Sequence, residues 1–208
     1  MEAATFFYFL TASILLTLAP GPDILYLLTK SLSSGAREGI FLAAGLVSGI
    51  AFHTFLVMVG VAAVIQNSPL AQLVLKVFGA AYLLFLAFKA FRAAQAGAKI
   101  SMKKAGTESS LGELYRRGVL MNVLNPKVLL FFLAFLPQFV NLAAESASLQ
   151  IALLGLTFAL QAFVIFSAIA VAAAKVRKLI LRRKNLGQIL AYVEAFVLAA
   201  IAVTLLLF

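Results

Sequence analysis

The chain has 208 residues, of which 64% are hydrophobic and 12% are charged. Soluble domains contain about 45–50% apolar residues, so this composition excludes an ordinary soluble protein and indicates one embedded in a lipid bilayer. The net charge of +10 would suit nucleic acid, but the basic residues fall in short segments between long apolar runs, so we expect no nucleic-acid partner. The chain has no cysteine, which excludes disulfide bonds and thiolate metal sites.

Six apolar runs follow one another, each close to or above the roughly 20 residues that a helix needs to cross a bilayer. They predict an all-α integral membrane protein with six transmembrane helices. The runs are Ala3 to Leu28, Gly39 to Ile65, Leu70 to Phe91, Gly118 to Leu142, Leu149 to Ala174 and Leu186 to Phe208.

The positive charges predict the orientation of these helices. Fourteen of the 17 Lys and Arg residues lie in the first, third and fifth connections, and the other two connections have none. Because basic connections remain in the cytoplasm, we expect both termini to lie outside. The fourteen are Lys30, Arg37, Arg92, Lys99, Lys103, Lys104, Arg116, Arg117, Lys175, Arg177, Lys178, Arg182, Arg183 and Lys184.

The first run is interrupted by the stretch LAPGPD, which contains Pro20, Gly21, Pro22 and Asp23. A proline lacks an N–H group and its ring collides with the carbonyl four residues earlier, so the break should free backbone carbonyls around residues 16 to 18. Irregular backbone at membrane depth is tolerated only inside protein or beside a wet cavity, which predicts a cavity here. We expect a helix to resume at Pro22, with its positive N-terminal end facing that cavity.

The second run carries His53, the only histidine of the chain, and the glycine pair Gly45 and Gly49. A single histidine between phenylalanines suits packing, and proton coupling is the alternative. The glycine pair allows close helix contact, either within the chain or across a homo-oligomer.

A long polar segment, 93–117, separates a first three-helix unit, 1–92, from a second, 118–208. We interpret it as a basic cytoplasmic linker whose lysines lie in water or on anionic lipid headgroups, so membrane lipid is an expected partner. Ser110 and Glu113 fit a capping box that would start a short helix leading into the fourth run.

The two units each contain an odd number of spans, so they enter the membrane from opposite sides and form two inverted repeats. Transporters built in this way bind substrate where the paired helices are interrupted. The fourth run has such an interruption at Asn125, Pro126 and Lys127. Helix rise places Asp23 roughly 10 Å and Lys127 roughly 15 Å from the cytoplasmic ends of their spans, which is a similar depth. The two charges can pair or face one cavity.

Two further polar residues are expected near this layer. Glu194 in the sixth run lies roughly 15 Å from the cytoplasmic face, where it can exchange protons or partner Lys127. Gln161 in the fifth run lies near the middle of the membrane, where it can line the path or bond to another helix.

A site of this kind suits an amino acid. The substrate carboxylate fits a helix N-terminus or Lys127, and its ammonium fits freed carbonyls or Asp23. The alternative is that the prolines only kink the helices and the charges form a structural pair. An enzyme is not expected, because H-E-x-x-H is absent and GLVSG at 45–49 lacks the spacing of a serine site. The chain also lacks a phosphate-binding loop for ATP hydrolysis.

Three motifs occur in order along the chain: LAPGPD at 18–23, the glycine pattern of Gly35, Arg37, Gly39, Gly45 and Gly49, and NPKVLLFFLAFLPQFV at 125–140. Together they resemble the lysine exporter (LysE/RhtB) superfamily of small bacterial amino-acid exporters. The resemblance implies a cofactor-free secondary exporter of an amino acid or related small metabolite across the bacterial cytoplasmic (inner) membrane, driven by the proton gradient.

The resemblance does not specify the substrate. The alternatives are an exporter of a metal ion or another small solute, and a non-transporting membrane subunit. One histidine with no cysteine gives little support to a metal site, so we expect none.

Overall fold

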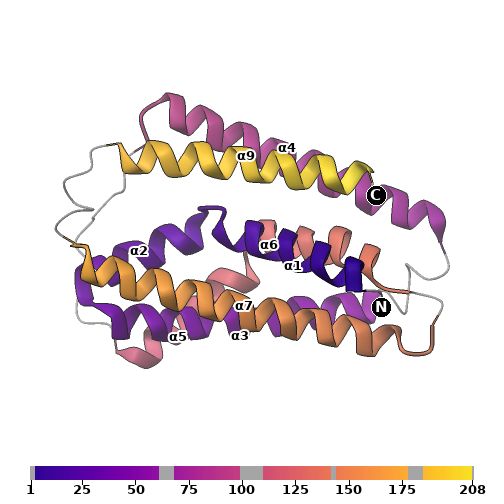
Figure 1. The fold of residues 1–208 in the computed structure, drawn as a ribbon, viewed down its shortest axis with the longest axis horizontal. Coiled ribbons are helices and arrows are strands. Elements are labelled where there is room, and N and C mark those ends of the chain that lie inside the picture. Colours follow the sequence, from indigo (N-terminus) through magenta and orange to yellow (C-terminus); the bar gives the residue numbers. More distant parts are fainter. Residues whose placement is uncertain (1–2, 61–67, 99–109, 142–143, 178–184, 208) are drawn as a thin grey trace.

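The computed structural model describes residues 3–60, 68–98, 110–141, 144–177 and 185–207. Throughout this part the chain is helical wherever it has regular structure, and the helices run roughly along one long axis (Figure 1). The elements are α1 (Ala3–Leu18), α2 (Pro22–Ser34), α3 (Ala36–Gly60), α4 (Pro69–Gln95), α5 (Leu111–Val123), α6 (Pro126–Leu130), a π-helical turn η2 (Phe131–Phe135), a 3-10 turn η3 (Leu136–Phe139), α7 (Ala147–Lys175) and α9 (Leu186–Leu207).

Four of these helices, α3, α4, α7 and α9, are individually long and apolar enough to cross a membrane. Two bent pairs bring the number to six if each pair is one span. The first pair, α1 with α2, bends by 57°, and the second, α5 with α6 to η3, bends by 48°. Both bends fall at the proline-containing stretches that the sequence singled out.

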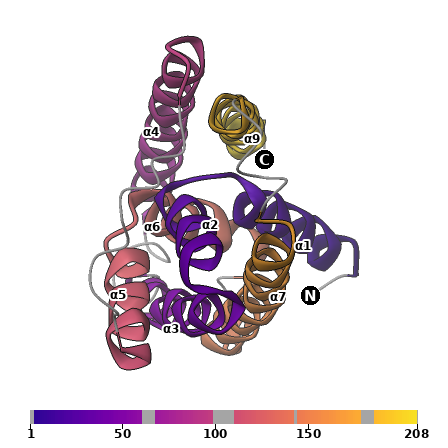
Figure 2. The same cartoon turned by 90° about the vertical axis from the view of Figure 1, so that its left-hand side faces the viewer.

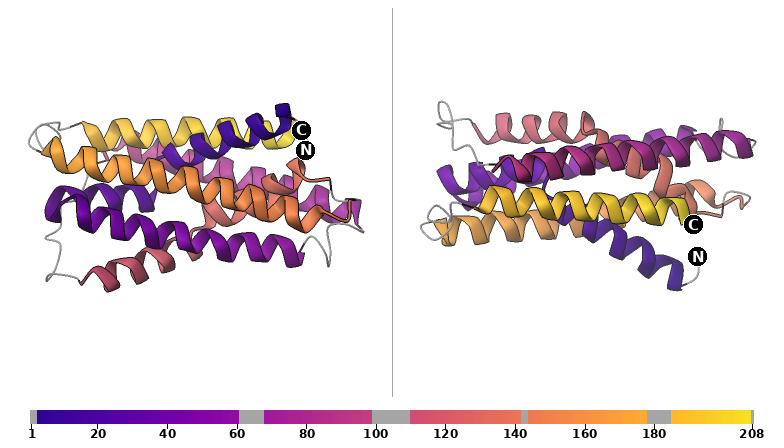
Figure 3. Two further views of the ribbon diagram at one scale, coloured as in Figure 1. Left: turned by 60° about the horizontal axis from the view of Figure 1, so that its bottom comes forward. Right: turned by 90° about the horizontal axis from the view of Figure 1, so that it is seen from above.

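The two ends of the molecule differ in what they carry. Figures 1 and 3 show the N- and C-termini at one end, whereas the α2–α3 junction, the start of α5, the end of α7 and the start of α9 lie at the opposite end. Several basic residues of the expected cytoplasmic connections belong to segments 99–109 and 178–184 and lie outside the described residues. Of the expected linker 93–117, residues 93–95 belong to α4 and residues 111–117 to α5.

The first bend has a local cause. Helix α1 ends at Leu18, and α2 begins at Pro22 as expected, with Gly21 as its extended N-cap and no side-chain cap. Helix α2 then continues further than the apolar run suggested and ends at Ser34, capped by Gly35, whose φ of 120° favours glycine. Lys30, expected in a connection, therefore lies within α2 and is only 5% exposed.

The second bend has a matching cause. Ser110 and Glu113 form the expected capping box at the start of α5. Helix α5 ends at Val123, and α6 starts at Pro126 with Asn125 as its N-cap. The carbonyl oxygen of the Asn125 side chain accepts the backbone N–H of Lys127 at 3.0 Å, which satisfies one free donor of the new helix.

The helices form two groups. Helices α4 and α9 pack along each other and contact the remainder mainly through η2, α6 and α1. The second group is built around α3, which packs against both α5 and α7, and α2 lies against α3 and α7. Figure 2 shows the α4–α9 pair standing to one side of the second group.

The contact between α3 and α5 depends on glycines. A methyl group at Gly45 would collide with the backbone carbonyl of Tyr115, and one at Gly118 would collide with the carbonyl oxygen of Leu42. The expected glycine pair of α3 therefore serves a helix contact within the chain. Backbone atoms on the facing helix cannot move aside as a side chain can.

We expect Gly118→Ala to lower the stability of the solubilised protein by about 1–3 kcal/mol, because the added methyl group overpacks this contact. Gly112→Ala in the same helix is the matched control, since a methyl group there meets nothing within 4 Å. The control should be neutral or stabilising by up to about 1 kcal/mol. The measurement is the thermal midpoint of each detergent-solubilised variant, and equal midpoints would refute the packing role.

Candidate functional site

The two breaks lie side by side at the centre of the molecule. The side-chain amide of Asn125 donates a hydrogen bond to Asp23 Oδ2 at 2.7 Å and so joins segments 102 positions apart in the chain. Both residues are buried, with 5% of Asp23 and 4% of Asn125 exposed. The N-cap of one resumed helix thus holds the first-turn carboxylate of the other.

Lys127 satisfies carbonyls that the first break frees. Its ammonium nitrogen donates to the carbonyl oxygen of Ala19 at 2.9 Å and to that of Leu16 at 3.4 Å. The side chain is 7% exposed, so this cation is held almost entirely inside the protein. The sequence predicted that carbonyls near residues 16 to 18 would need partners, and the cation of the second break is one.

Asp23 and Lys127 do not form a direct ion pair in the part of the chain that the structure describes. They line one small cavity of about 20 Å³, which has room for about one water-sized group. Of the two arrangements expected from the sequence, the structure shows the shared cavity. The residues lining it are Leu16, Thr17, Asp23, Ile24, Ile50, Asn122, Lys127, Val128, Phe158 and Phe166.

Asn122 is a member of this cavity that the sequence reasoning missed. It lies in the last turn of α5, three positions before Asn125, and is 2% exposed. The available signal was a second asparagine inside an apolar run beside the break. Gln161, in contrast, was noted: its amide donates to Thr17 Oγ1 at 2.9 Å and so links α7 to α1 at the cavity wall.

Glu194 approaches the site from α9. A methyl group built on Gly21 would lie 3.3 Å from Lys127 Nζ and 3.6 Å from Glu194 Oε1, so the two side chains meet at this glycine. Both Glu194 and Asp23 are close enough to attract the Lys127 ammonium electrostatically. Gly21 thus leaves the space in which the cation and the second carboxylate approach each other.

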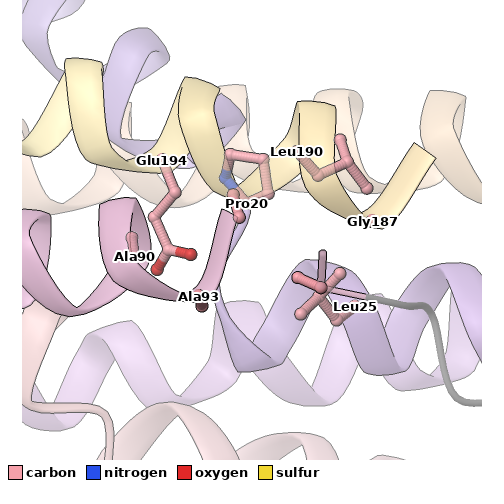
Figure 4. A pocket seen from close by; sticks show the side chains of 9 residues that line it. Pro20, Leu25, Ala90, Ala93, Gly187, Leu190 and Glu194 are labelled. Atoms are coloured by element: carbon pink, nitrogen blue, oxygen red, sulfur yellow. The ribbon is translucent and has the colours of Figure 1, made fainter. Parts of the chain in front are cut away.

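A second cavity, of about 120 Å³, adjoins Glu194. Figure 4 shows the Glu194 carboxylate extending from α9 toward Ala90 and Ala93 of α4, with Pro20 of the first break beside it. Pro20 and Glu194 thus line the same larger space between the helix groups. The residues lining it are Pro20, Leu25, Ala90, Ala93, Ala98, Gly187, Leu190, Ala191 and Glu194.

A comparison with protein families supplies the identification. The family model described as LysE type translocator matches residues 14–207, which include both breaks and every cavity residue named above. The chain belongs to the LysE-type translocator family. This LysE-type translocator is accordingly a multi-pass membrane transporter and not an enzyme.

Relatives of this LysE-type translocator include two proteins named leucine efflux protein, from Salmonella choleraesuis (strain SC-B67) and Salmonella paratyphi A (strain ATCC 9150 / SARB42). Each is 30% identical over 183 residues, covering 87% of this chain and 84% of the relative. No solved structure gives a significant match.

His53 of the translocator is completely buried in α3. Its Nε2 lies 2.9 Å from the backbone carbonyl oxygen of Asn122, so this nitrogen carries the proton and donates. The ring lies 5.8 Å, centroid to centroid, from that of Phe132. These contacts tie α3 to the end of α5 directly behind the cavity.

No group of three or more His, Asp or Glu side chains suited to a metal ion occurs within the described ranges of the translocator. The carboxylates of Asp23 and Glu194 both attract the Lys127 ammonium. This fixed cation repels a metal ion, so the arrangement suits an organic zwitterion better.

Proposed function

We propose that this protein is a secondary active exporter of an amino acid or a closely related small metabolite across the bacterial cytoplasmic membrane. The observation that carries the proposal is the meeting of two broken helices around one cavity, with Asp23, Asn125 and Lys127 at its centre. Broken helices that meet at such a depth are typical substrate sites of transporters. Family membership and the names of the relatives support the same conclusion, with leucine as the first substrate to test.

The residues at the breaks have separate roles in this proposal. Pro20, Gly21, Pro22 and Pro126 shape the breaks, and Asn125 fixes the distance between them. Lys127 holds the freed carbonyls in the absence of substrate and offers a cation to the substrate carboxylate. The free N–H groups at the start of α2 add a favourable dipole for the same carboxylate.

The proposed architecture is a pair of inverted repeats. The first repeat comprises α1 with α2, α3 and α4, and the second comprises α5 with α6 to η3, α7 and α9. Each repeat starts with a bent pair and continues with two single helices that are long enough to span a membrane. The placement of both termini at one end, opposite the basic connections, supports an orientation with both termini outside.

Proton coupling in this proposal acts through Glu194. Its carboxylate lies beside the Lys127 ammonium and faces the 120 Å³ cavity, so it can exchange a proton with water and compete for the same cation. His53 is the alternative carrier, but its protonated nitrogen is already bonded to a backbone carbonyl among aromatic rings. The geometry favours the glutamate.

The test is leucine transport by purified protein in proteoliposomes under an imposed pH gradient. Wild type should transport leucine against its concentration gradient, and Glu194→Gln should lose this uphill transport while retaining exchange of labelled for unlabelled leucine. Glu145→Gln, at an exposed position before α7, is the matched control and should behave as wild type.

Two other outcomes would change the proposal. Absence of any amino-acid flux in wild type, with leucine or a panel of amino acids, would overturn the proposed function. Loss of uphill transport in His53→Gln but not in Glu194→Gln would transfer the coupling role to the histidine.

A further inference from the structure

Two acceptor atoms in the small cavity have no hydrogen-bond partner. They are Oδ1 of Asp23 and Oδ1 of Asn122, in side chains that are 5% and 2% exposed. A buried polar atom without a partner costs about 1–3 kcal/mol, and more when the group is charged. Two such atoms in one cavity call for a ligand that donates hydrogen bonds.

Four neighbouring donors of the chain already have acceptors. The Asn125 amide is bonded to the other oxygen of Asp23, and the Lys127 ammonium points to the carbonyls of Ala19 and Leu16. On the other sides of the cavity, the Gln161 amide is bonded to Thr17, and the protonated nitrogen of His53 is bonded to the backbone of Asn122.

The position of Asn122 is built into the packing. A methyl group on Gly49 would come within 2.8 Å of both Cβ and Oδ1 of Asn122, so this glycine of α3 provides the room for the side chain. The hydrogen bond from His53 fixes the backbone of the same residue. Helix α3 thus holds Asn122 in place from two successive turns.

The chemistry of the cavity defines the ligand. A carboxylate and an amide oxygen together suit a primary ammonium, which carries a positive charge and three N–H donors. The remaining wall is apolar except for Thr17 and Lys127, and it includes Ile50, Phe158 and Phe166. The space of about 20 Å³ accommodates an ammonium-sized group, and a whole amino acid requires the helices that line the cavity to move apart.

We propose that Asp23 and Asn122 together bind the ammonium group of the transported amino acid, and that the apolar wall selects an aliphatic side chain. This inference rests on the proposed export function and assigns Asn122 as a substrate-binding residue. The substrate class is then a neutral amino acid with a free primary amine and a hydrophobic side chain.

The test measures inhibition of leucine uptake in exchange proteoliposomes by leucine and by N-methylleucine. In wild type, N-methylleucine should inhibit more weakly than leucine, because one N–H donor is missing. Asn122→Ala should raise the half-inhibitory concentration of leucine about ten- to a hundred-fold, as expected for the loss of one charge-assisted hydrogen bond. In this variant the two compounds should inhibit with similar strength. The N–H donor that leucine has and N-methylleucine lacks no longer finds an acceptor at position 122.

Asn185→Ala is the matched control, since Asn185 is exposed before α9 and distant in sequence from both breaks. Two further inhibitors are tested on wild type alone. 4-Methylpentanoate lacks the ammonium and lysine has a charged side chain, so both should inhibit leucine uptake poorly. Equal inhibition by leucine and 4-methylpentanoate would overturn the ammonium site, and equal inhibition by lysine would overturn the selection of aliphatic side chains.

The proposed function and this inference fail in different ways. If wild type transports no amino acid, the export function fails. If wild type transports leucine but Asn122→Ala retains its affinity and its preference for the primary amine, the cavity binds only water at Asn122 and the present inference fails alone.

Discussion

Replacing Asp23 with Asn should abolish the proposed leucine export, in a variant that still folds and inserts into the membrane. The new side chain has almost the same shape, and its carbonyl oxygen can still accept the hydrogen bond from Asn125 that Asp23 accepts at 2.7 Å. What is lost is the negative charge that attracts Lys127 and, in our proposal, the substrate ammonium. Losing one member of a buried charged contact costs about 2–5 kcal/mol, so the export rate should fall at least about 30-fold.

The measurement is the initial rate of leucine efflux from proteoliposomes containing equal amounts of folded protein. Glu145→Gln removes a carboxylate charge in the same chemical way at an exposed position and should leave the rate unchanged. A rate close to that of wild type in Asp23→Asn would remove this residue from the site.

Replacing Lys127 with Met should abolish export and also destabilise the protein. The carbonyls of Ala19 and Leu16 lose their donor, and the carboxylates of Asp23 and Glu194 lose the cation that they attract. Removing one partner of a buried charged contact destabilises a protein by about 3–5 kcal/mol. Thermal midpoints of the solubilised variants, together with efflux rates, measure the two effects separately.

Two further variants separate charge from packing in this experiment. Lys89→Met makes the same substitution at an exposed position of α4 and should change neither quantity. The double variant Asp23→Asn with Lys127→Met should recover part of the lost stability, because it removes the unpaired carboxylate, but should not recover export. Strictly additive losses of stability would show that the two charges do not interact.

The breaks were predictable because their causes are local. Pro20 and Pro22 cannot continue a helix, and both Pro22 and Pro126 stand where a helix can begin. The capping box at Ser110 follows from the same short-range chemistry. In each case the residues that decide the backbone lie within four positions of the feature.

The partners across the site were not predictable from local patterns. That Lys127 would bond to the carbonyl of Ala19, and Asn125 to Asp23, depends on contacts between residues more than 100 positions apart. Matched depth along the helices indicated that Asp23 and Lys127 would meet, but it could not distinguish an ion pair from a shared cavity. That distinction depends on side-chain directions set by tertiary packing.

Two other features had weak or misleading signals. Asn122 sits among apolar neighbours, and only its distance from Gly49 and His53 in the fold explains its position. The π-helical turn Phe131–Phe135 has no distinct sequence signal, and its rings stack with each other, Phe131 on Phe135 at 4.8 Å between centroids. Such turns are frequent at functional sites, and this one directly follows the break at Pro126.

The central claim is that substrate binds in the cavity between the two breaks, and cysteine protection tests it most directly. The chain has no cysteine, so Thr17→Cys introduces a single thiol at the cavity wall. Leucine should slow the reaction of this thiol with a small water-soluble thiol reagent, and it should have no effect on Ser34→Cys at the exposed end of α2. Equal reaction rates of Thr17→Cys with and without leucine, in protein that still transports leucine, would contradict the account.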